Sequence, residues 1–402
     1  MSQVFFYVQN LLGIGHLRRA TVLAKSMCEA GLGVDFVAGG FPVPGLDLGG
    51  ARLIQLPPVR AADERFSTFL DDGGRPIDES WRARRRTALL DAFDAAKPEV
   101  VLIELYPFGR RAFRFELEPL LEAADARPNR PEILCSVRDI LVEKAKPGRA
   151  EQAAATIERY FDTVLVHGDS AVAPFSASFI VADRIAGKIR YTGYVVEPRR
   201  ATGSSESAAG TVLVSVGGGA VGRPLVEAAL AARPISAARG LPWRIMLGPH
   251  YPEREAAALM TGVMPGVTVE RFHPDLAALF EDCALSISQA GYNTVLELIA
   301  AGARAVVVPF STGVESEQAA RARRLADRSL LTVVEEATLT PAALAEAIDR
   351  ALAAPRPGPG GGLCLEGAGH TAAFLIEAVA QRRASRHDGR RPAETLTGKH
   401  QS

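Results

Sequence analysis

The sequence ALSISQAGYNTVLELIAAGARAVVVPFSTGVESEQ, residues 284–318, holds the clearest secondary-structure pattern in this chain. Its first apolar residues predict a strand, and Gly291 predicts the turn that ends the strand. An apolar stripe then predicts a helix, whose start Asn293 and Thr294 are expected to cap. A β-branched run predicts a second strand after it. The stretch is therefore expected to form one βαβ unit.

The helix of this unit begins where a parallel strand ends, and such a place binds anions. Free backbone N–H groups and the positive end of the helix dipole both lie there. One turn into the helix stands Glu297, which would repel a phosphate but would accept hydrogen bonds from the hydroxyls of a sugar. A phosphate site beside a ribose site indicates that the ligand is a nucleotide.

The same alternation of short apolar runs and helical stripes occurs twice along the chain, which predicts an α/β protein with two Rossmann-like domains facing a cleft. A run rich in Pro, Gly, Ser and Arg separates the two series. We expect an N-terminal domain at residues 1–196, a linker at 197–210, a C-terminal domain at 211–383 that includes a last helix at about 370–383, and a disordered tail at 384–402.

The composition excludes several classes of protein. The 402 residues include 46 basic and 46 acidic ones, so no overall charge favours nucleic acid as a partner. The four cysteines form no C-x-x-C pair, which predicts reduced core thiols, no disulfide and no metal site. The first predicted strand begins at Val4, and no apolar run reaches the roughly 18 residues that span a bilayer. We expect a cytoplasmic protein.

The first turn between strand and helix carries Gly13, Gly15 and His16. A dinucleotide-binding turn would need a third glycine where Arg18 stands and an acidic residue near positions 38–40, so NAD is disfavoured and no cofactor is expected. The turn instead places His16 at a helix N-terminus, where a neutral imidazole suits general-base work. The alternative is that His16 only caps the helix.

Two further segments of the second domain suit a nucleotide. Gly217, Gly218 and Gly219 follow its first strand, and their backbone could approach a diphosphate closely. Phe272 and His273 follow a later strand, where the ring could stack on a base. The alternatives are a tight turn without a ligand for the glycines and a phenylalanine that covers the core.

Basic residues also follow the strands of the first domain. Arg110, Arg111 and Arg138 lie at the carboxyl ends of predicted strands, where they could hold an anionic group of an acceptor. Glu104 shares this edge and is a second candidate acid or base. The arginines between 82 and 86 lie within a predicted helix, for which a solvent-exposed face is the favoured interpretation.

Together these residues resemble the GT-B glycosyltransferases, and among them the MurG-like group, glycosyltransferase family 28. The resemblance covers nearly the whole chain and is strongest from 272 to 318. It also extends to an uncharacterised group of predicted glycosyltransferases with the signatures LLGIGHLRRA and PFGRR. In family 28 the matching residues bind the nucleotide sugar through Gly291 and Glu297, the donor sugar through Glu317 and Gln318, and the base next to Phe272; Gly13, Gly15 and His16 face the acceptor.

The resemblance implies a metal-independent hexosyltransferase that moves a sugar from a nucleoside-diphosphate sugar, expected to be a UDP-sugar, to a hydroxyl acceptor. Family 28 acceptors are lipid-linked, which implies peripheral contact with the inner face of the membrane. The Gly-Ile-Gly-His turn is also similar to that of the UDP-sugar hydrolase of pseudaminic acid synthesis. A hydrolase, a sugar epimerase of the same fold and a non-catalytic nucleotide-sugar binding protein therefore stay open as alternatives.

Overall fold

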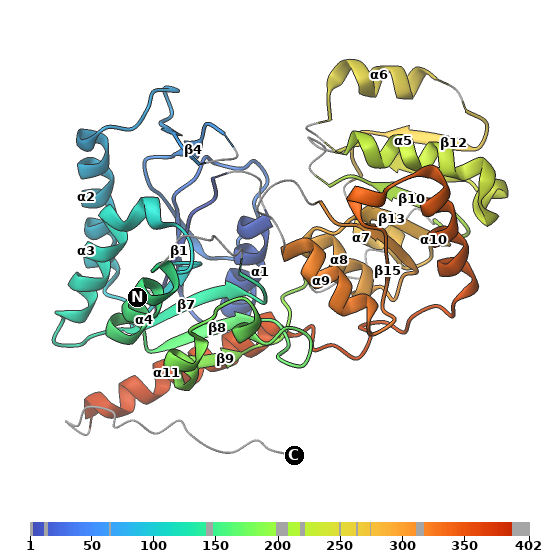
Figure 1. Ribbon diagram of the computed structural model, residues 1–402. Helices are drawn as coiled ribbons and strands as arrows, with labels where there is room; N and C mark the ends of the chain where they lie inside the picture. Colours follow the sequence, from blue (N-terminus) through green and yellow to red (C-terminus); the bar gives the residue numbers. More distant parts are fainter. Residues whose placement is uncertain are drawn as a thin grey trace.

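The computed structural model consists of two α/β domains that lie side by side (Figure 1). The N-terminal domain occupies the left of the view and the C-terminal domain the right. The structure describes residues 3–11, 15–63, 66–141, 148–197, 208–217, 222–248, 251–262, 264–273, 275–310 and 317–387.

The N-terminal domain is built on a parallel sheet of seven strands within the described residues, in the order β3-β2-β1-β6-β7-β8-β9. The domain also contains a short antiparallel pair, β4 and β5. The strands are β1 (Val4–Val8), β2 (Val34–Ala38), β3 (Arg52–Gln55), β4 (Arg60–Ala61), β5 (Phe69–Leu70), β6 (Val100–Glu104), β7 (Glu132–Arg138), β8 (Thr163–His167) and β9 (Ile189–Tyr191).

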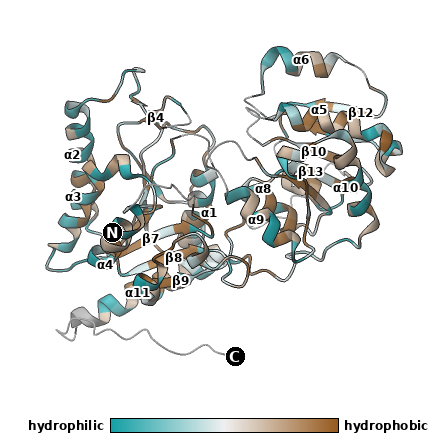
Figure 2. Ribbon diagram, in the orientation of Figure 1, coloured by the Kyte–Doolittle hydropathy of each residue, from teal (hydrophilic) through white to brown (hydrophobic). Residues whose placement is uncertain are grey.

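Helices cover both faces of this sheet, because its central strands are apolar on both sides. Alternate residues of β1 point to opposite faces: Phe5 packs in one apolar cluster and Phe6 in the other. In Figure 2 the apolar colour accordingly gathers in the strands and on the inner sides of the helices. The helices are α1 (Gly15–Glu29), α2 (Glu79–Ala96), α3 (Arg114–Asp125) and α4 (Arg149–Tyr160).

The C-terminal domain repeats the design with a parallel sheet in the order β12-β11-β10-β13-β14-β15. The βαβ unit predicted from residues 284–318 is β13, α8 and β14. The strands are β10 (Val212–Ser215), β11 (Trp243–Met246), β12 (Val267–Glu270), β13 (Leu285–Gln289), β14 (Ala305–Val308) and β15 (Thr332–Val333), and the helices are α5 (Arg223–Ala232), α6 (Glu253–Thr261), α7 (Leu276–Phe280), α8 (Tyr292–Ala300), α9 (Glu317–Ala326) and α10 (Pro341–Ala353).

The last helix, α11 (Gly367–His387), belongs to the N-terminal domain, which corrects the predicted domain boundary. Its apolar residues Phe374, Leu375 and Val379 are buried in the same cluster as β1 and α1. Figure 1 shows this helix running beneath the N-terminal sheet. The helix also extends to His387, past the predicted start of the disordered tail at 384; residues 388–402 lie outside the described residues.

Two segments connect the domains, and they are hydrogen-bonded to each other. The backbone N–H of Tyr194 donates to the carbonyl of Cys364 over 2.8 Å, and the N–H of Gly367 donates back to Tyr194 over 2.9 Å. A β-carbon on Gly367 would lie 2.3 Å from the carbonyl oxygen of Gly193, so only glycine fits there. This pairing lies just before the predicted linker at 197–210. Residues 198–207 of that linker lie outside the described residues, and Ala208 after them is buried.

Candidate active site at the domain boundary

His16 and Glu104 meet where α1 begins and β6 ends. The imidazole Nδ1 of His16 lies 2.7 Å from Oε1 of Glu104, whose side chain is 1% exposed. The two residues stand 88 positions apart in sequence. The parallel sheet brings them together because β6 lies next to β1, the strand that precedes α1. The two residues predicted as catalytic thus form one pair.

Arginines surround the carboxylate of this pair. Arg19 donates to Oε1 of Glu104 over 2.6 Å, and Nη2 of Arg110 lies 4.0 Å from Oε2. Burial alone would raise the pKa of Glu104, but His16, Arg19 and Arg110 outweigh it and lower that pKa to about 2. Glu104 is therefore ionised, and it accepts a hydrogen bond from Nδ1 of His16.

The other ring nitrogen of His16 faces Arg138, the last residue of β7. Nη2 of Arg138 lies 2.9 Å from Nε2 of His16. A guanidinium only donates hydrogen bonds, so Nε2 is the acceptor and Nδ1 carries the ring proton. Burial, which Arg138 and Arg110 reinforce and Glu104 opposes, lowers the pKa of His16 to about 3. The ring is consequently neutral.

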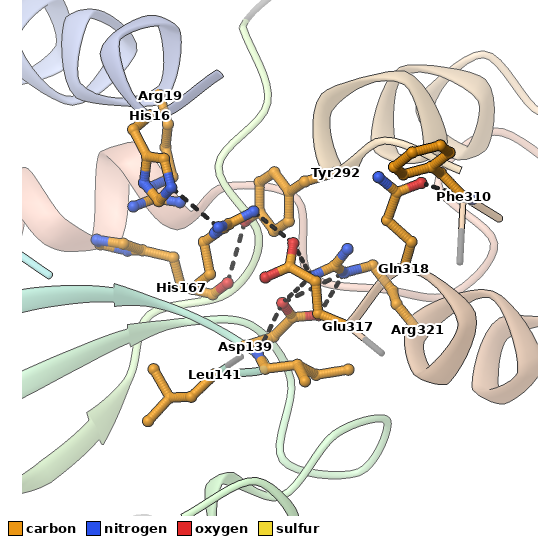
Figure 3. A network of polar contacts seen from close by, with 12 residues as sticks. His16, Arg19, Asp139, Leu141, His167, Tyr292, Phe310, Glu317, Gln318 and Arg321 are labelled. Atoms are coloured by element: carbon orange, nitrogen blue, oxygen red, sulfur yellow. Dashed lines mark hydrogen bonds and ion pairs between the residues drawn. The ribbon is translucent and has the colours of Figure 1, made fainter. Parts of the chain in front are cut away.

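Two ion pairs join the end of β7 to the start of α9 in the other domain (Figure 3). Arg138 donates to Glu317 over 2.5 Å. Its neighbour Asp139 accepts two hydrogen bonds from Arg321, at 2.9 and 2.8 Å, and both side chains are almost completely buried. Residues 317 and 321 lie one helical turn apart on one face of α9, so they meet the last residue of β7 and the residue that follows it.

The start of α8 faces the start of α1 across the same boundary. Tyr292, the first residue of α8, donates from its hydroxyl to the carbonyl of His167 over 3.1 Å. The guanidiniums of Arg19, Arg138 and Arg321 lie 5.7, 6.0 and 4.9 Å from the centre of its ring. A β-carbon on Gly15 would lie 3.9 Å from Nδ2 of Asn293. The predicted anion site of the βαβ unit thus lies opposite His16.

The first turn of α8 differs in one respect from the prediction. Gly291 is the N-cap and has no side chain to close the helix, whereas Asn293 and Thr294 lie inside the first turn. The expectation that these two residues cap the helix was wrong. The N–H groups at the start of α8 are thus without a side-chain cap. Further along, burial raises the pKa of Glu297 to about 7 against the opposing charge of Arg18.

The other residues predicted to bind the donor are placed as follows. Gly217 has a left-handed φ of 57°, which the turn after β10 requires. Phe272 is 62% exposed, so it does not cover the core. Nδ1 of His273 accepts from the backbone N–H of Asp275. The side-chain oxygen of Gln318 accepts a hydrogen bond from the backbone N–H of Phe310 over 3.3 Å (Figure 3). This bond links the segment after β14 to the start of α9.

Some predicted residues lie elsewhere. The guanidinium of Arg111 donates to the backbone oxygen of Arg149 and contacts neither His16 nor Glu104 in the part of the chain that the structure describes. Arg85, expected on a solvent-exposed face, is fully buried in an ion pair with Glu116. Of the four cysteines, Cys364 is exposed and is not a core thiol. Gly13, Gly218 and Gly219 lie outside the described residues.

Within the described part of the chain, several buried polar atoms around His16 have no hydrogen-bond partner, although buried polar groups are nearly always paired. They include both donors and acceptors. A ligand with hydroxyl groups and anionic oxygens could satisfy both kinds of atom. In this cluster they are Nε of Arg19, Oε2 of Glu104, Nε of Arg110, Oε2 of Glu317 and Nη1 of Arg321.

Comparison with known proteins accounts for the C-terminal half of this site. The glycosyltransferase family 28 C-terminal domain matches residues 211–357. Because of this match we refer to residues 211–357 as the family 28 domain. The family 28 domain contains α8, β14 and α9, and therefore Gly291, Glu297, Glu317 and Gln318. The family resemblance predicted from the sequence is confirmed for this region.

Curated relatives of this chain are UDP-N-acetylglucosamine–N-acetylmuramyl-(pentapeptide) pyrophosphoryl-undecaprenol N-acetylglucosamine transferases. The one from Nitratidesulfovibrio vulgaris is 33% identical over 153 residues, which are 37% of this chain and 40% of the relative. The one from Thiobacillus denitrificans is 39% identical over 80 residues, 20% of this chain and 22% of the relative. The matches thus span less than half the length of these relatives.

Solved structures extend the likeness to the whole fold. Acinetobacter baumannii MurG is 18% identical with a TM-score of 0.61, and the match covers 93% of this chain and 99% of that one. CalG4, the calicheamicin glycosyltransferase, is 15% identical with a TM-score of 0.58, over 96% and 98% of the two chains. The chain accordingly has the GT-B fold, as predicted.

Within the described residues, no helix is both long and apolar enough to cross a membrane. The same residues contain no group of three or more His, Cys, Asp or Glu side chains placed to hold a metal ion.

Sequence reasoning missed four residues of the site: Arg19, Asp139, Tyr292 and Arg321. Arg19 and Arg321 stand in arginine-containing helices that look solvent-exposed in sequence. One signal was available, since the acid and base at 317 and 321 are four apart on one helix face and match the consecutive base and acid at 138 and 139. No local pattern indicates that these two pairs meet.

Proposed function

We propose that this protein transfers a sugar from a UDP-sugar to a hydroxyl group of an acceptor. The observation that carries the proposal is the His16–Glu104 pair, which faces the start of α8 in a GT-B fold whose residues 211–357 match the family 28 C-terminal domain. A neutral imidazole at this boundary can accept a proton, and a helix N-terminus opposite it can hold a diphosphate.

The reaction requires one proton transfer and one displacement. Nε2 of His16 takes the proton of the acceptor hydroxyl while that oxygen attacks the anomeric carbon of the donor sugar. The bond between that carbon and the diphosphate oxygen breaks, and the diphosphate leaves with the electron pair. Glu104 accepts a hydrogen bond from Nδ1 throughout, so it fixes the ring orientation and stabilises the imidazolium that forms.

The family 28 domain would bind the donor. Backbone N–H groups at Gly291 and at Gly217, Gly218 and Gly219 would stabilise the charge that develops on the departing diphosphate. Glu297 would accept hydrogen bonds from the ribose. We assign the donor sugar to Glu317 and Gln318, with Asn293 and Thr294 beside the phosphates, and the base to the exposed ring of Phe272 and to His273.

The acceptor would approach from the N-terminal domain. Arg110 and Arg138 lie around Glu104 and His16, so an acceptor with an anionic group suits this side. The acceptor named for the curated relatives is a pyrophosphoryl-undecaprenol derivative, and their donor is UDP-N-acetylglucosamine. We therefore propose a lipid-linked acceptor for this chain as well, with peripheral contact at the inner face of the membrane.

The first experiment measures release of nucleoside diphosphate by the purified full chain from a panel of UDP-, dTDP- and GDP-sugars, with water as the sole acceptor and then with a lipid extract. The dTDP-sugars belong in the panel because a GT-B neighbour, the spinosyn rhamnosyltransferase SpnG, has been solved with thymidine diphosphate. The proposal predicts saturable binding of one donor, negligible release in water and fast release with the extract.

Each alternative predicts a different result from the same panel. A hydrolase would release the diphosphate rapidly in water. An epimerase would change the sugar without releasing the nucleotide. A binding protein would bind the donor and turn over nothing with any acceptor. Each of these outcomes would contradict the transferase proposal.

A further inference from the structure

Arg138 holds the proposed base and a residue of the proposed donor site at the same time. Its Nη2 donates to Nε2 of His16 over 2.9 Å, and its Nη1 donates to Oε1 of Glu317 over 2.5 Å. The first contact lies within the N-terminal domain and the second crosses to the family 28 domain. A change at the donor site can therefore be transmitted directly to the base.

The contact with His16 blocks the chemistry proposed above. A neutral imidazole has one lone pair in the plane of its ring, on the nitrogen without a proton. In this arrangement the lone pair of Nε2 accepts a hydrogen bond from Arg138, so the hydroxyl of an acceptor substrate cannot transfer its proton to Nε2. Nδ1 offers no substitute, because it already donates its proton to Glu104. Arg138 must leave Nε2 before turnover.

We propose that Arg138 is a positioning residue that caps His16 when no donor is bound and is drawn off when a nucleotide sugar occupies the family 28 domain. This inference rests on the proposed function. It adds to it that the base becomes available only in the presence of the donor, so that an acceptor or water arriving first meets an inactive imidazole.

The two ion pairs at the end of β7 indicate which contact can open. Arg321 and Asp139 are 1% and 0% exposed and bind through two hydrogen bonds. The side chains of Arg138 and Glu317 are 19% and 7% exposed, and Oε2 of Glu317 has no hydrogen-bond partner among the residues that the structure describes. The first pair is more deeply buried and is held by two hydrogen bonds, so it can hold α9 against the end of β7 while the second pair exchanges partners.

A donor would supply new partners for both members of the second pair. The guanidinium of Arg138 lies 6.0 Å from the ring centre of Tyr292, the residue that follows the N-cap of α8. A diphosphate at this helix start would offer paired anionic oxygens, which bind a guanidinium better than one neutral ring nitrogen does. A sugar hydroxyl could donate to the unpartnered Oε2 of Glu317. Both changes would release Nε2.

The test follows the ring nitrogens of His16 by NMR in the full chain labelled with ¹⁵N-histidine, assigned with His16→Gln. Without donor, the wild-type ring should stay neutral with the proton on Nδ1, consistent with a pKa of about 3. Removing the cation with Arg138→Met should raise the midpoint of His16 protonation by about one pH unit or more. Glu104, Arg19, Arg110 and Glu317 remain in place as the other charged neighbours.

Arg324→Met is the matched control. Arg324 also crosses the domain boundary, where it donates to the carbonyl of Val172 over 3.1 Å, but it does not contact His16. This variant should leave the His16 resonances and titration unchanged. Glu317→Gln provides a second route if Arg138→Met folds poorly, because it frees the far end of Arg138 and should weaken the contact with Nε2.

The donor step is tested by adding the nucleotide sugar that the panel selects, or UDP-N-acetylglucosamine as the first probe, to the wild-type protein. Nε2 of His16 should shift toward its position in Arg138→Met. The cap is refuted if wild type and Arg138→Met titrate alike without donor, and its release is refuted if Nε2 is unmoved at saturating donor. If no nucleotide sugar binds, the proposed function fails, while the measurement without donor still decides the cap.

Discussion

The two sides of the domain boundary are built differently. The N-terminal side holds His16 among buried, ionised side chains, and Glu104 beside it has a pKa of about 2. The C-terminal side presents the uncapped start of α8 and Glu297, whose pKa is near 7. Fixed charge suits the orientation of a proton acceptor, and backbone N–H groups suit the binding of an anion. We infer that the N-terminal side carries the chemistry and the C-terminal side the affinity.

The largest effect is expected from His16→Gln. Loss of a positioned general base should lower turnover by about 10² to 10⁴-fold at saturating donor and acceptor. Initial rates of diphosphate release measure it. The matched control is His370→Gln, since His370 is half exposed on α11 and lies outside the boundary. Equal rates of diphosphate release in the two variants would show that His16 is not the general base.

The buried ion pair between the sides should dominate the stability of their contact. Asp139→Ala removes both hydrogen bonds to the buried Arg321 and leaves Glu317, 3.6 Å away, as its acidic neighbour, which should cost about 3–5 kcal/mol in the free energy of unfolding. Arg184→Ala breaks a pair that is 41% and 39% exposed and should cost less than about 1 kcal/mol. Urea denaturation of both variants measures the two losses in the free energy of unfolding. Comparable losses would contradict the larger contribution expected from the buried pair.

The end of the chain should stabilise the N-terminal side alone. Leu375→Ala removes a fully buried side chain of α11 and should cost about 2–5 kcal/mol, whereas Ile376→Ala, at an exposed neighbour, should cost about 0.5 kcal/mol or less. The two tryptophans report on the domains separately, Trp81 on α2 and Trp243 on β11. If Leu375→Ala shifts the unfolding transition only in the Trp243 signal, α11 stabilises the C-terminal domain instead.

A smaller effect should appear in the pH dependence of donor binding. Glu297 has a pKa raised to about 7, so it gains a proton as the pH falls through 7 and becomes a weaker hydrogen-bond acceptor for a ribose hydroxyl. Affinity for UDP-N-acetylglucosamine should fall by about tenfold from pH 8 to pH 6. Calorimetric titration of Glu297→Gln should show weaker donor binding that does not depend on pH between 8 and 6. If the pH dependence is unchanged in this variant, another group causes it.

The sequence predicts what local patterns encode. The βαβ unit at 284–318 follows from apolar periodicity and one glycine, and the N-terminal glycine turn indicates His16. Contacts across the fold leave no such signal: the pairing of Glu104 with His16 depends on which strands become neighbours, and Arg321 looks like a surface residue until Asp139 is placed beside it. Chain order likewise suggested the C-terminal domain for α11, because the sequence does not record that its apolar face packs on α1.

The division between the two sides is tested most directly by titrating the selected nucleotide sugar into His16→Gln and Glu297→Ala. We predict that His16→Gln binds the donor within about twofold of wild type while it turns over slowly, and that Glu297→Ala binds about tenfold more weakly because it loses hydrogen bonds to a charged group. Weakened binding in His16→Gln with unchanged binding in Glu297→Ala would contradict the assignment of chemistry and affinity to the two sides.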